Sequence, residues 1–414
     1  MGAREHINKV LIFIVIIAIV LKYLPLSQDT KLALGYSKNS FLNFTEVTAK
    51  NQYRSEEHTV VTEDGYVLTM FRITKGRNCH HPKKQRPVLI MHGLLENSDV
   101  FLDAGPSAGL AYLLSDACYD VWVGNQRGNN YARRHIKLNP DKDADFWQFS
   151  VEEVGLYDVP ALVDHILQNT GVDKLNYIGF SQGCTAYFIM CSERPDYRDK
   201  TAVMIALAPA VILVNQESVL LKTIFNSALF FKRILEMFGI HEIFSKGTFN
   251  QELMEYVCQV TGPSWTGRLC GSVGYLDSYN PGSMTSDTQQ LVFSHTLMGT
   301  SLNTLVQYGQ VLHSGRFQKF DYGETINLRK YNSTQAPEYN LSAVSTPVLI
   351  IQGKSDKLIG NKDTKVVSRR LPNVLELVEV SDPKWNHFDM LYNRDIKTMI
   401  YPKINEYLQK YSEN

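Results

Sequence analysis

The sequence predicts an α/β fold with a mostly parallel central sheet, interrupted once by a long helical insertion. Short apolar runs alternate with helix-like segments in the first half of the chain, as a parallel sheet requires. Two further buried-strand runs begin at residues 347 and 374, close to the C-terminus. The length of 414 residues suits one such core enlarged by an insertion, so we expect no second independent core.

The first expected element is a hairpin, because Asp64-Gly65 is a strong turn signal between strand-like runs at 59–63 and 66–73. The next expected elements are a strand at 87–91, a helix near 108–115, a strand at 120–124, a helix near 157–168 and a strand at 174–179. The alternation then stops, and residues 212–335 are predicted to form an inserted helical cap. The core should therefore comprise residues 28–211 and 336–414.

One short motif, Gly179-Phe180-Ser181-Gln182-Gly183, lies between the strand-like run 175–178 and the helix-like run 184–191. A sharp turn from strand to helix strains the backbone of its central residue and requires neighbours without side chains. The two glycines meet this requirement. We therefore expect Ser181 to present its hydroxyl as a nucleophile, in preference to the simpler interpretation of an ordinary turn serine.

An acid and a base follow in an informative order. Asp356 comes just after the strand 347–351, and His387 lies in the polar loop after the strand 374–380. The order serine, aspartate, histidine is the order of the catalytic groups in an α/β-hydrolase. Alternatives of the same residue types are found elsewhere in the chain: Asp363 and Asp382 for the acid, and His295 and His313 for the base.

The strand 87–91 runs into His92-Gly93-Leu94-Leu95, where a glycine allows the backbone to approach a substrate closely. In the expected fold, the main-chain N–H groups of Leu94 and Gln182 would hold the oxyanion of a tetrahedral intermediate. His92 is expected to support this loop structurally. Arg127, in the loop after the strand 120–124, is expected to form a structural ion pair.

Several of these segments together resemble the acid lipase family, which includes gastric and lysosomal acid lipases and insect relatives. The resemblance covers roughly residues 40–410 and is carried by 58–68, 92–95, 125–129, 179–183 and 386–389. It implies an α/β-hydrolase core, a helical cap before the acid strand, and hydrolysis of neutral lipid esters without a cofactor. The sequence departs from the family at Phe180, where the family usually has histidine, and this affects the expected substrate preference.

The expected activity is therefore hydrolysis of triacylglycerols or sterol esters through an acyl-enzyme on Ser181. A short-chain carboxylesterase or a lipid thioesterase is an alternative, suggested by Phe180. A non-catalytic lipid-binding protein on the same fold is an alternative of another class. The combination of Ser181, Asp356 and His387 argues against the last alternative, because lipid binding alone requires none of them.

Charge and composition narrow the expected partners. Lysine and arginine together number 42, as do aspartate and glutamate, so nothing favours electrostatic binding of nucleic acid. We expect a neutral lipid ester at a lipid–water interface as the partner, with no obligatory protein partner. The apolar segment 219–244 is expected either to pack within the cap or to act as a lid that exposes a lipid-binding surface.

The N-terminus predicts entry into the secretory pathway. Residues 1–27 contain an apolar run of 12 residues, too short to span a membrane and typical of a signal peptide. An uncleaved membrane anchor is the alternative, because the cleavage site lacks small residues. The sequons at Asn43, Asn332 and Asn340 are glycosylation candidates in such a protein, which would be secreted or lysosomal.

Of the six cysteines, Cys258 and Cys270 fall in the predicted cap and are a candidate disulfide. Cys118, Cys184 and Cys191 are expected to be buried as small hydrophobic residues. Cys79 begins the run Cys79-His80-His81, whose residue types suit a metal but which has no second cluster at zinc spacing, so a solvated loop is expected.

Overall fold

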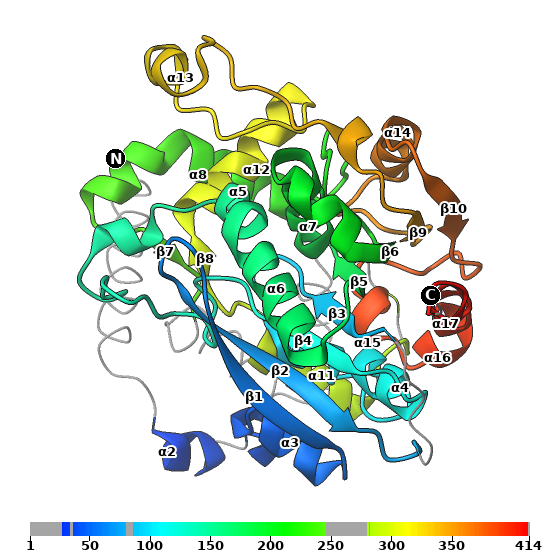
Figure 1. Cartoon of the computed structure of the whole chain (residues 1–414). Coiled ribbons are helices and arrows are strands. Elements are labelled where there is room, and N and C mark those ends of the chain that lie inside the picture. The colour runs from blue at the N-terminus through cyan, green and yellow to red at the C-terminus, as the bar shows by residue number, and fades with distance from the viewer. Residues whose placement is uncertain (1–26, 34–35, 80–85, 246–279, 281, 413–414) are drawn as a thin grey trace.

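A computed structural model describes residues 27–33, 36–79, 86–245, 280 and 282–412 (Figure 1). At its centre is an eight-stranded sheet in the order β1-β2-β4-β3-β5-β6-β9-β10. Its strands are β1 (Arg54–Val61), β2 (Val67–Lys75), β3 (Val88–Met91), β4 (Val121–Gly124), β5 (Leu175–Phe180), β6 (Thr201–Leu207), β9 (Val348–Gln352) and β10 (Val374–Glu379). All pairs from β4 to β10 are parallel, whereas β1, β2 and β4 pair antiparallel. The predicted fold class is confirmed.

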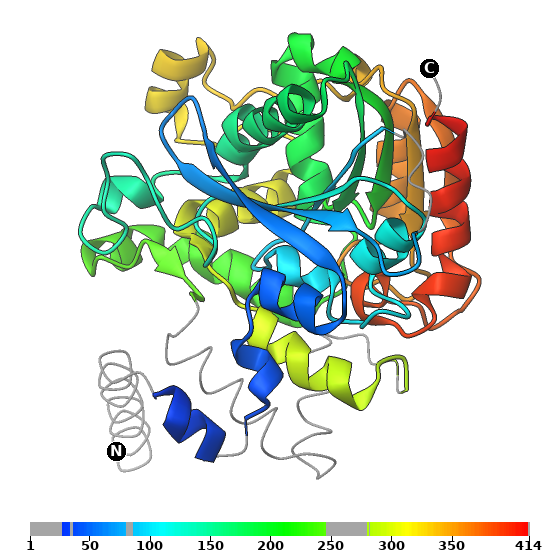
Figure 2. The ribbon, with the colours of Figure 1, turned by 60° about the horizontal axis from the view of Figure 1, so that its bottom comes forward.

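Helices cover both faces of the parallel part of the sheet, which explains why its strands are continuous apolar runs. In β5, Tyr177 packs with helices of one face and Ile178 with helices of the other, because successive side chains of a strand point to opposite faces. Figure 2 shows the strands between these two layers. The helices of the first face are α6 (Val159–Thr170) and α7 (Gln182–Glu193), and those of the second are α4 (Leu110–Asp116), α15 (Asp389–Tyr392), α16 (Ile396–Met399) and α17 (Tyr401–Lys410).

The opening hairpin is present, and its turn depends on Gly65. This residue has φ +96°, a conformation that disfavours a side chain, and a Cβ there would lie 2.8 Å from Nε2 of His135. The strand β6 was not predicted, although Thr201–Leu207 is an apolar run that is buried throughout. It completes the parallel sheet between β5 and β9.

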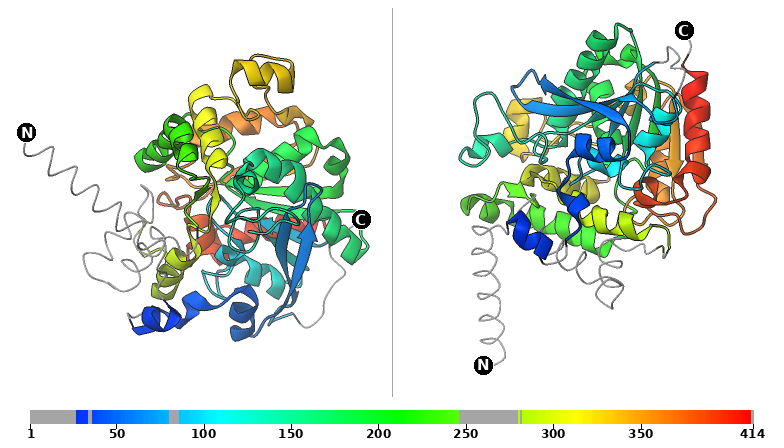
Figure 3. Two further views of the ribbon diagram at one scale, coloured as in Figure 1. Left: turned by 90° about the vertical axis from the view of Figure 1, so that its left-hand side faces the viewer. Right: turned by 90° about the horizontal axis from the view of Figure 1, so that it is seen from below.

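Between β6 and β9 the described part of the chain is largely helical. Its described elements are α8 (Val219–Met237), β7 (Glu242–Ile243), α11 (Ser286–His295), β8 (Thr300–Ser301), α12 (Leu302–Ser314) and α13 (Glu324–Tyr331). The helices α8 and α12 lie side by side (Figure 3), with the rings of Phe225 and Tyr308 stacked 5.5 Å apart. They approach closely at Gly309, where a Cβ would lie 2.9 Å from the carbonyl oxygen of Phe225.

The described residues form four further α-helices, besides several short 3₁₀ turns. They are α2 (Gln28–Ala33), α3 (Phe44–Lys50), α5 (Val151–Glu153) and α14 (Asn361–Arg370). The leader expected at residues 1–27 lies almost wholly outside the described residues. Among the helices that are described, none is both long and apolar enough to cross a membrane.

The structure contains a disulfide that was not predicted. Cys118 forms a disulfide with Cys79, so its prediction as a free buried residue was wrong. The two cysteines meet because Cys79 follows β2, Cys118 precedes β4, and these strands are antiparallel neighbours. Cys184 and Cys191 are free and buried, as predicted. The candidate pair Cys258 and Cys270 lies outside the described residues.

All three glycosylation candidates are exposed asparagines. Asn43 caps α3, where its Oδ1 accepts a hydrogen bond of 2.9 Å from the main-chain N–H of Glu46. Its amide nitrogen, the atom to which a glycan is attached, has no partner among the described residues. Asn332 ends α13 and Asn340 precedes a short 3₁₀ turn. Each side chain is therefore sterically available for modification.

A buried ion-pair cluster joins the hairpin turn to α6. The fully buried guanidinium of Arg127 donates to Oδ1 of Asp158 at 2.8 Å and to Oδ2 of Asp64 at 2.6 Å. It also lies 3.9 Å from the centre of the Tyr66 ring. The predicted structural ion pair of Arg127 is thus confirmed.

We expect the variant Arg127→Met to lower the free energy of unfolding by about 3–5 kcal/mol, because it leaves the buried Asp158 carboxylate without its cation. The matched control is Arg194→Met, which removes a surface pair with Glu63 and should change stability by less than about 1 kcal/mol. Urea unfolding followed by tryptophan fluorescence measures both. Equal effects of the two substitutions would contradict the structural role of the cluster.

Candidate active site

Ser181 occupies the turn between β5 and α7, with φ 51° and ψ −112°. Such a positive φ is uncommon for a residue with a side chain and indicates stored backbone strain. The adjoining glycine is required sterically, because a Cβ at Gly183 would lie 2.4 Å from the carbonyl oxygen of Met91. The strained serine and the close approach expected from the motif are both present.

The structure brings Asp356 and His387 together, although 31 residues separate them. Nδ1 of His387 donates to Oδ2 of Asp356 at 2.8 Å, and both side chains are buried. The carboxylate also accepts from the main-chain N–H groups of Leu358 at 3.0 Å and Ile359 at 2.8 Å. These donors fix the carboxylate, and the carboxylate in turn fixes the imidazole with Nε2 unprotonated.

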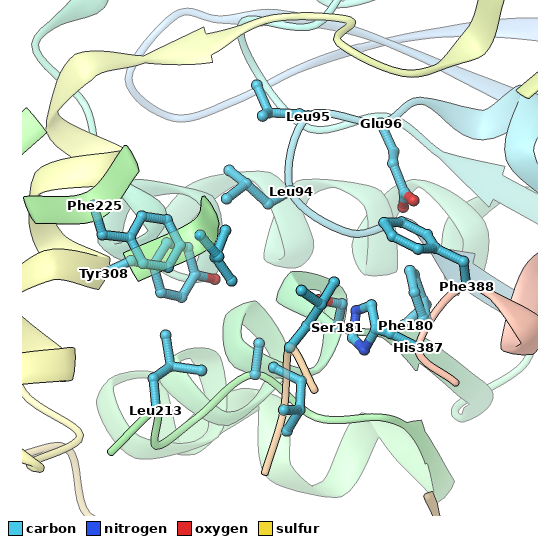
Figure 4. Close-up of a pocket in the computed structure, with 14 residues that line it drawn as sticks. Leu94, Leu95, Glu96, Phe180, Ser181, Leu213, Phe225, Tyr308, His387 and Phe388 are labelled. Carbon is cyan, nitrogen blue, oxygen red and sulfur yellow. The ribbon is translucent and has the colours of Figure 1, made fainter. Parts of the chain in front are cut away.

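The alternative acid and bases have other partners. Asp363 accepts two hydrogen bonds from Asn215, from its main-chain N–H at 2.8 Å and its amide at 2.6 Å. His295 pairs with the buried Asp103 at 2.7 Å, and His313 contacts Asn226. Of these histidines, only His387 lines the same cavity as Ser181 (Figure 4).

The two main-chain N–H groups expected to hold an oxyanion come from two segments, the loop after β3 and the start of α7. Leu94 follows β3, and Gln182 is the first residue of α7. Within the described part of the chain, neither N–H donates to a protein acceptor. Gln182 is at the start of a helix, where an N–H group has no partner within the helix and remains available to a ligand.

The side chain of Gln126 links these two segments. Its amide nitrogen donates to the carbonyl oxygen of His92 at 2.6 Å, and its amide oxygen accepts from Nε2 of Gln182 at 2.5 Å. Gln126 therefore spans the gap between the loop of Leu94 and the first turn of α7. The sequence analysis gave no signal for this bridge, because it joins residues 34 and 56 positions apart.

His92 supports the same loop, as predicted. Its Nε2 accepts from the main-chain N–H of Gln126 at 3.1 Å, so Nδ1 carries the proton and donates to the carbonyl oxygen of Gly93 at 2.8 Å. Burial lowers the pKa of His92 to about 4, which keeps the ring neutral in this arrangement.

The loop of His387 is held by Asp389, a residue that the sequence analysis did not single out for a role. The carboxylate of Asp389 accepts from the main-chain N–H of Asn386 at 2.9 Å, and the amide oxygen of Asn386 accepts from the N–H of Asp389 at 2.9 Å. Asn280 and Asn393 donate further hydrogen bonds to the same carboxylate. His387 is thus enclosed by a reciprocal pair of hydrogen bonds between its neighbours.

A cavity of about 90 Å³ opens onto Ser181 and His387. Its walls are predominantly apolar and come from the core and from the inserted helices (Figure 4). The helices α8 and α12 contribute Leu221, Phe225 and Tyr308. The remaining lining residues are Leu94, Leu95, Glu96, Phe180, Ala210, Leu213, Leu358, Ile359 and Phe388.

Phe180, the residue before the serine, packs against the base. Its ring centre lies 4.7 Å from that of His387, with the planes inclined by 43°, and its side chain is 1% exposed. The Asp356–His387 pair is formed with phenylalanine in this position. Phe180 therefore changes the surroundings of the imidazole by presenting an apolar ring beside it.

Comparison with known proteins identifies the family. The partial α/β-hydrolase lipase region matches residues 44–105, and the α/β hydrolase fold matches residues 86–393. Lipase 1 of Drosophila melanogaster is 37% identical over 390 residues, which cover 93% of this chain and 84% of that protein. The gastric triacylglycerol lipase of Homo sapiens is 33% identical over 366 residues, covering 88% of this chain and 90% of that protein.

The chain belongs to the acid lipase family. This lipase is a carboxylic ester hydrolase, and lipid esters are its class of substrate. A solved structure of a putative lipase from Sulfolobus solfataricus has a TM-score of 0.56, with 12% identity, over 87% of this chain and 95% of that chain. At this level of identity the likeness confirms the fold alone.

Proposed function

We propose that this lipase cleaves esters of neutral lipids by transferring the acyl group first to Ser181 and then to water. The observation that carries the proposal is the 2.8 Å hydrogen bond between His387 and Asp356 in a cavity that Ser181 also lines. Because Nδ1 of His387 is bound to the carboxylate, Nε2 has the lone pair that a general base needs.

In the proposed reaction, Nε2 of His387 takes the proton of Ser181 while the serine oxygen attacks the ester carbonyl. The N–H groups of Leu94 and Gln182 hold the negative oxygen that forms, and Asp356 stabilises the imidazolium. His387 then gives its proton to the leaving alcohol, and the acyl-enzyme remains. A water molecule, deprotonated by His387, then attacks the acyl-enzyme and releases the fatty acid. No metal or organic cofactor takes part in any proposed step.

The apolar cavity supports a neutral lipid as the substrate, because little but aliphatic and aromatic side chains would contact the acyl chain. The helix α8 supports action at a lipid surface. Its Phe225 lines the cavity, whereas Phe230 and Met237 are 80% and 85% exposed to solvent. One helix therefore supplies part of the cavity wall and presents an apolar surface outside it.

We propose further that the protein passes through the secretory pathway, and is secreted or lysosomal. The exposed sequons and the Cys79–Cys118 disulfide support this proposal, because disulfides persist in oxidising compartments. The leader could also remain uncleaved and anchor the protein to a membrane. Analysis of the N-terminus of the mature protein distinguishes this anchored form from a secreted or lysosomal one.

The variant Ser181→Ala should abolish hydrolysis of emulsified long-chain triacylglycerol and sterol ester, and Asp356→Asn should lower the rate by about 10⁴-fold. Titration of released fatty acid between pH 4 and 8 measures both. A serine-directed phosphonate should label the wild type but not Ser181→Ala. Ser192→Ala, in the same helix α7, is the matched control and should be labelled like the wild type.

Other outcomes of this experiment select the alternatives. Hydrolysis of short-chain esters or acyl thioesters alone would identify a carboxylesterase or a thioesterase, with Phe180 as the first residue to exchange. If the wild type hydrolyses none of these substrates and is not labelled, the protein is a lipid-binding protein without activity. Equal hydrolysis by wild type and Ser181→Ala would exclude Ser181 as the nucleophile.

The variant Gln126→Leu should lower kcat about 10–100-fold with little change in KM, because the two N–H donors lose their common support and the donors act mainly in the transition state. Steady-state kinetics on a soluble ester measure the effect. The matched control is Gln310→Leu in α12, since Gln310 also makes two hydrogen bonds, both to the main chain of Asp321. A similar fall of kcat in both variants would contradict a specific role of Gln126.

Expression in a secreting eukaryotic cell should give a glycoprotein whose mass falls when N-glycans are removed enzymatically. The substitutions Asn43→Gln, Asn332→Gln and Asn340→Gln should each remove one step, because all three asparagines are exposed. Electrophoretic mobility provides the measurement. An unglycosylated protein found only in the cytosol would contradict the proposed pathway.

A further inference from the structure

Glu96 places a carboxyl group in the wall of the active-site cavity. It follows Leu95, whose φ of 63° turns the chain so that the side chain of Glu96 returns over Gly93. Glu96 is only 4% exposed and lines the same cavity as Ser181 and His387. In Figure 4 its carboxyl group points toward Phe180 and Phe388.

Only one oxygen of this carboxyl group has a protein partner among the described residues. Oε2 accepts from the main-chain N–H of Gly93 at 2.8 Å, and Oε1 accepts no hydrogen bond from the described residues. Oε1 is not among the buried atoms that lack a partner, so it is accessible from the cavity that Glu96 lines. The few polar groups in an apolar binding cavity commonly meet a polar group of the ligand. Oε1 is therefore available to a substrate group.

The environment favours a neutral partner over a cation. Burial, with a smaller contribution from Asp103, raises the pKa of Glu96 to about 8, so the carboxyl group is mostly protonated at neutral pH. The other titratable groups that face this region are His387, Tyr392 and the Asp103–His295 pair. A protonated carboxyl group can both donate and accept a hydrogen bond, and a hydroxyl group is complementary to it in both respects.

The position of Glu96 indicates that its partner belongs to the alcohol part of the ester. In the proposed reaction the leaving alcohol lies beside His387, which protonates it. Phe180 and Phe388 both pack against the His387 ring, and Glu96 is on their side of the cavity (Figure 4). Leu213, Phe225 and Tyr308 lie on the other side, where they form an apolar wall suited to the acyl chain.

We infer that Glu96 is a specificity-determining residue that hydrogen-bonds a hydroxyl group on the alcohol part of the ester. The preferred substrates are then partial acylglycerols, which keep a free hydroxyl beside the scissile ester. Esters of alcohols without a further hydroxyl leave the buried carboxyl group unpaired, and sites of this kind discriminate against such analogues. This inference rests on the proposed function.

A matched pair of soluble substrates tests the inference: monooctanoylglycerol and propyl octanoate, which share an acyl chain and differ in the hydroxyls. The wild type should have a kcat/KM about tenfold or more higher for the glyceryl ester. In Glu96→Met this ratio should fall to about 1, whereas Glu96→Gln, which keeps a polar group in the cavity, should retain part of the preference. Both substitutions also weaken the hydrogen bond to the N–H of Gly93. This effect lowers the rates for both esters alike, so it cancels in the ratio of the two kcat/KM values.

The variant Glu152→Met is the matched control, because Glu152 is also buried and accepts from a main-chain N–H, that of Phe320 at 3.1 Å, outside the cavity. Its ratio should equal that of the wild type. Phosphonate labelling of Ser181 checks that each variant is folded. A wild-type ratio near 1, or a ratio unchanged in Glu96→Met, would overturn the inference and leave the proposed function intact. Absence of Ser181-dependent hydrolysis of both esters would overturn both.

Discussion

The close packing of the Ser181 turn on the end of β3 is the constraint on which the rest of the site depends. Gly183 lies so near the carbonyl oxygen of Met91 that no side chain fits between them. Because the first turn of α7 begins there, the N–H of Gln182 comes to the same edge of the sheet as the loop of Leu94. A larger residue at position 183 would separate β3 from α7 and with them the two halves of the site.

The parallel sheet brings Asp356 and His387 to the edge at which Ser181 lies. β9 and β10 are neighbours, and their carboxyl ends lie at the same edge as those of β3 and β5. Asp356 and His387 follow these two strands, so short loops suffice to bring the carboxylate to the imidazole. The arrangement requires no long-range flexibility, because main-chain N–H groups and Asp389 fix each loop from within.

Much of this could be predicted from the sequence, because local patterns determine it. An apolar run marked the strand before Ser181, a helix-like run marked the helix after it, and the glycines marked the turn between them. The order of Ser181, Asp356 and His387 then placed three residues at one sheet edge. The strand β6 was missed because a short buried run such as Thr201–Leu207 has no periodicity that distinguishes a strand from a helix segment.

The features that escaped prediction depend on contacts through space. The Cys79–Cys118 disulfide follows from the antiparallel pairing of β2 with β4, which residue spacing alone does not reveal. The bridge of Gln126 requires two loops to be at the right separation. Glu96 is separated from the glycine it contacts by only two residues, yet its place in the cavity wall with Phe180 and Phe388 is set by distant parts of the chain.

The charge state of Glu96 explains how a carboxyl group is compatible with this site. An ionised carboxylate beside the loop of Leu94 would repel the oxyanion that the two N–H groups are proposed to hold. Burial among apolar side chains raises the pKa of Glu96 to about 8 and so keeps the group neutral below that pH. The same apolar surroundings, including Phe180, form the cavity wall for a lipid. The apolar lining that suits the proposed lipid substrate is therefore also what raises the pKa of the carboxyl group in the cavity wall.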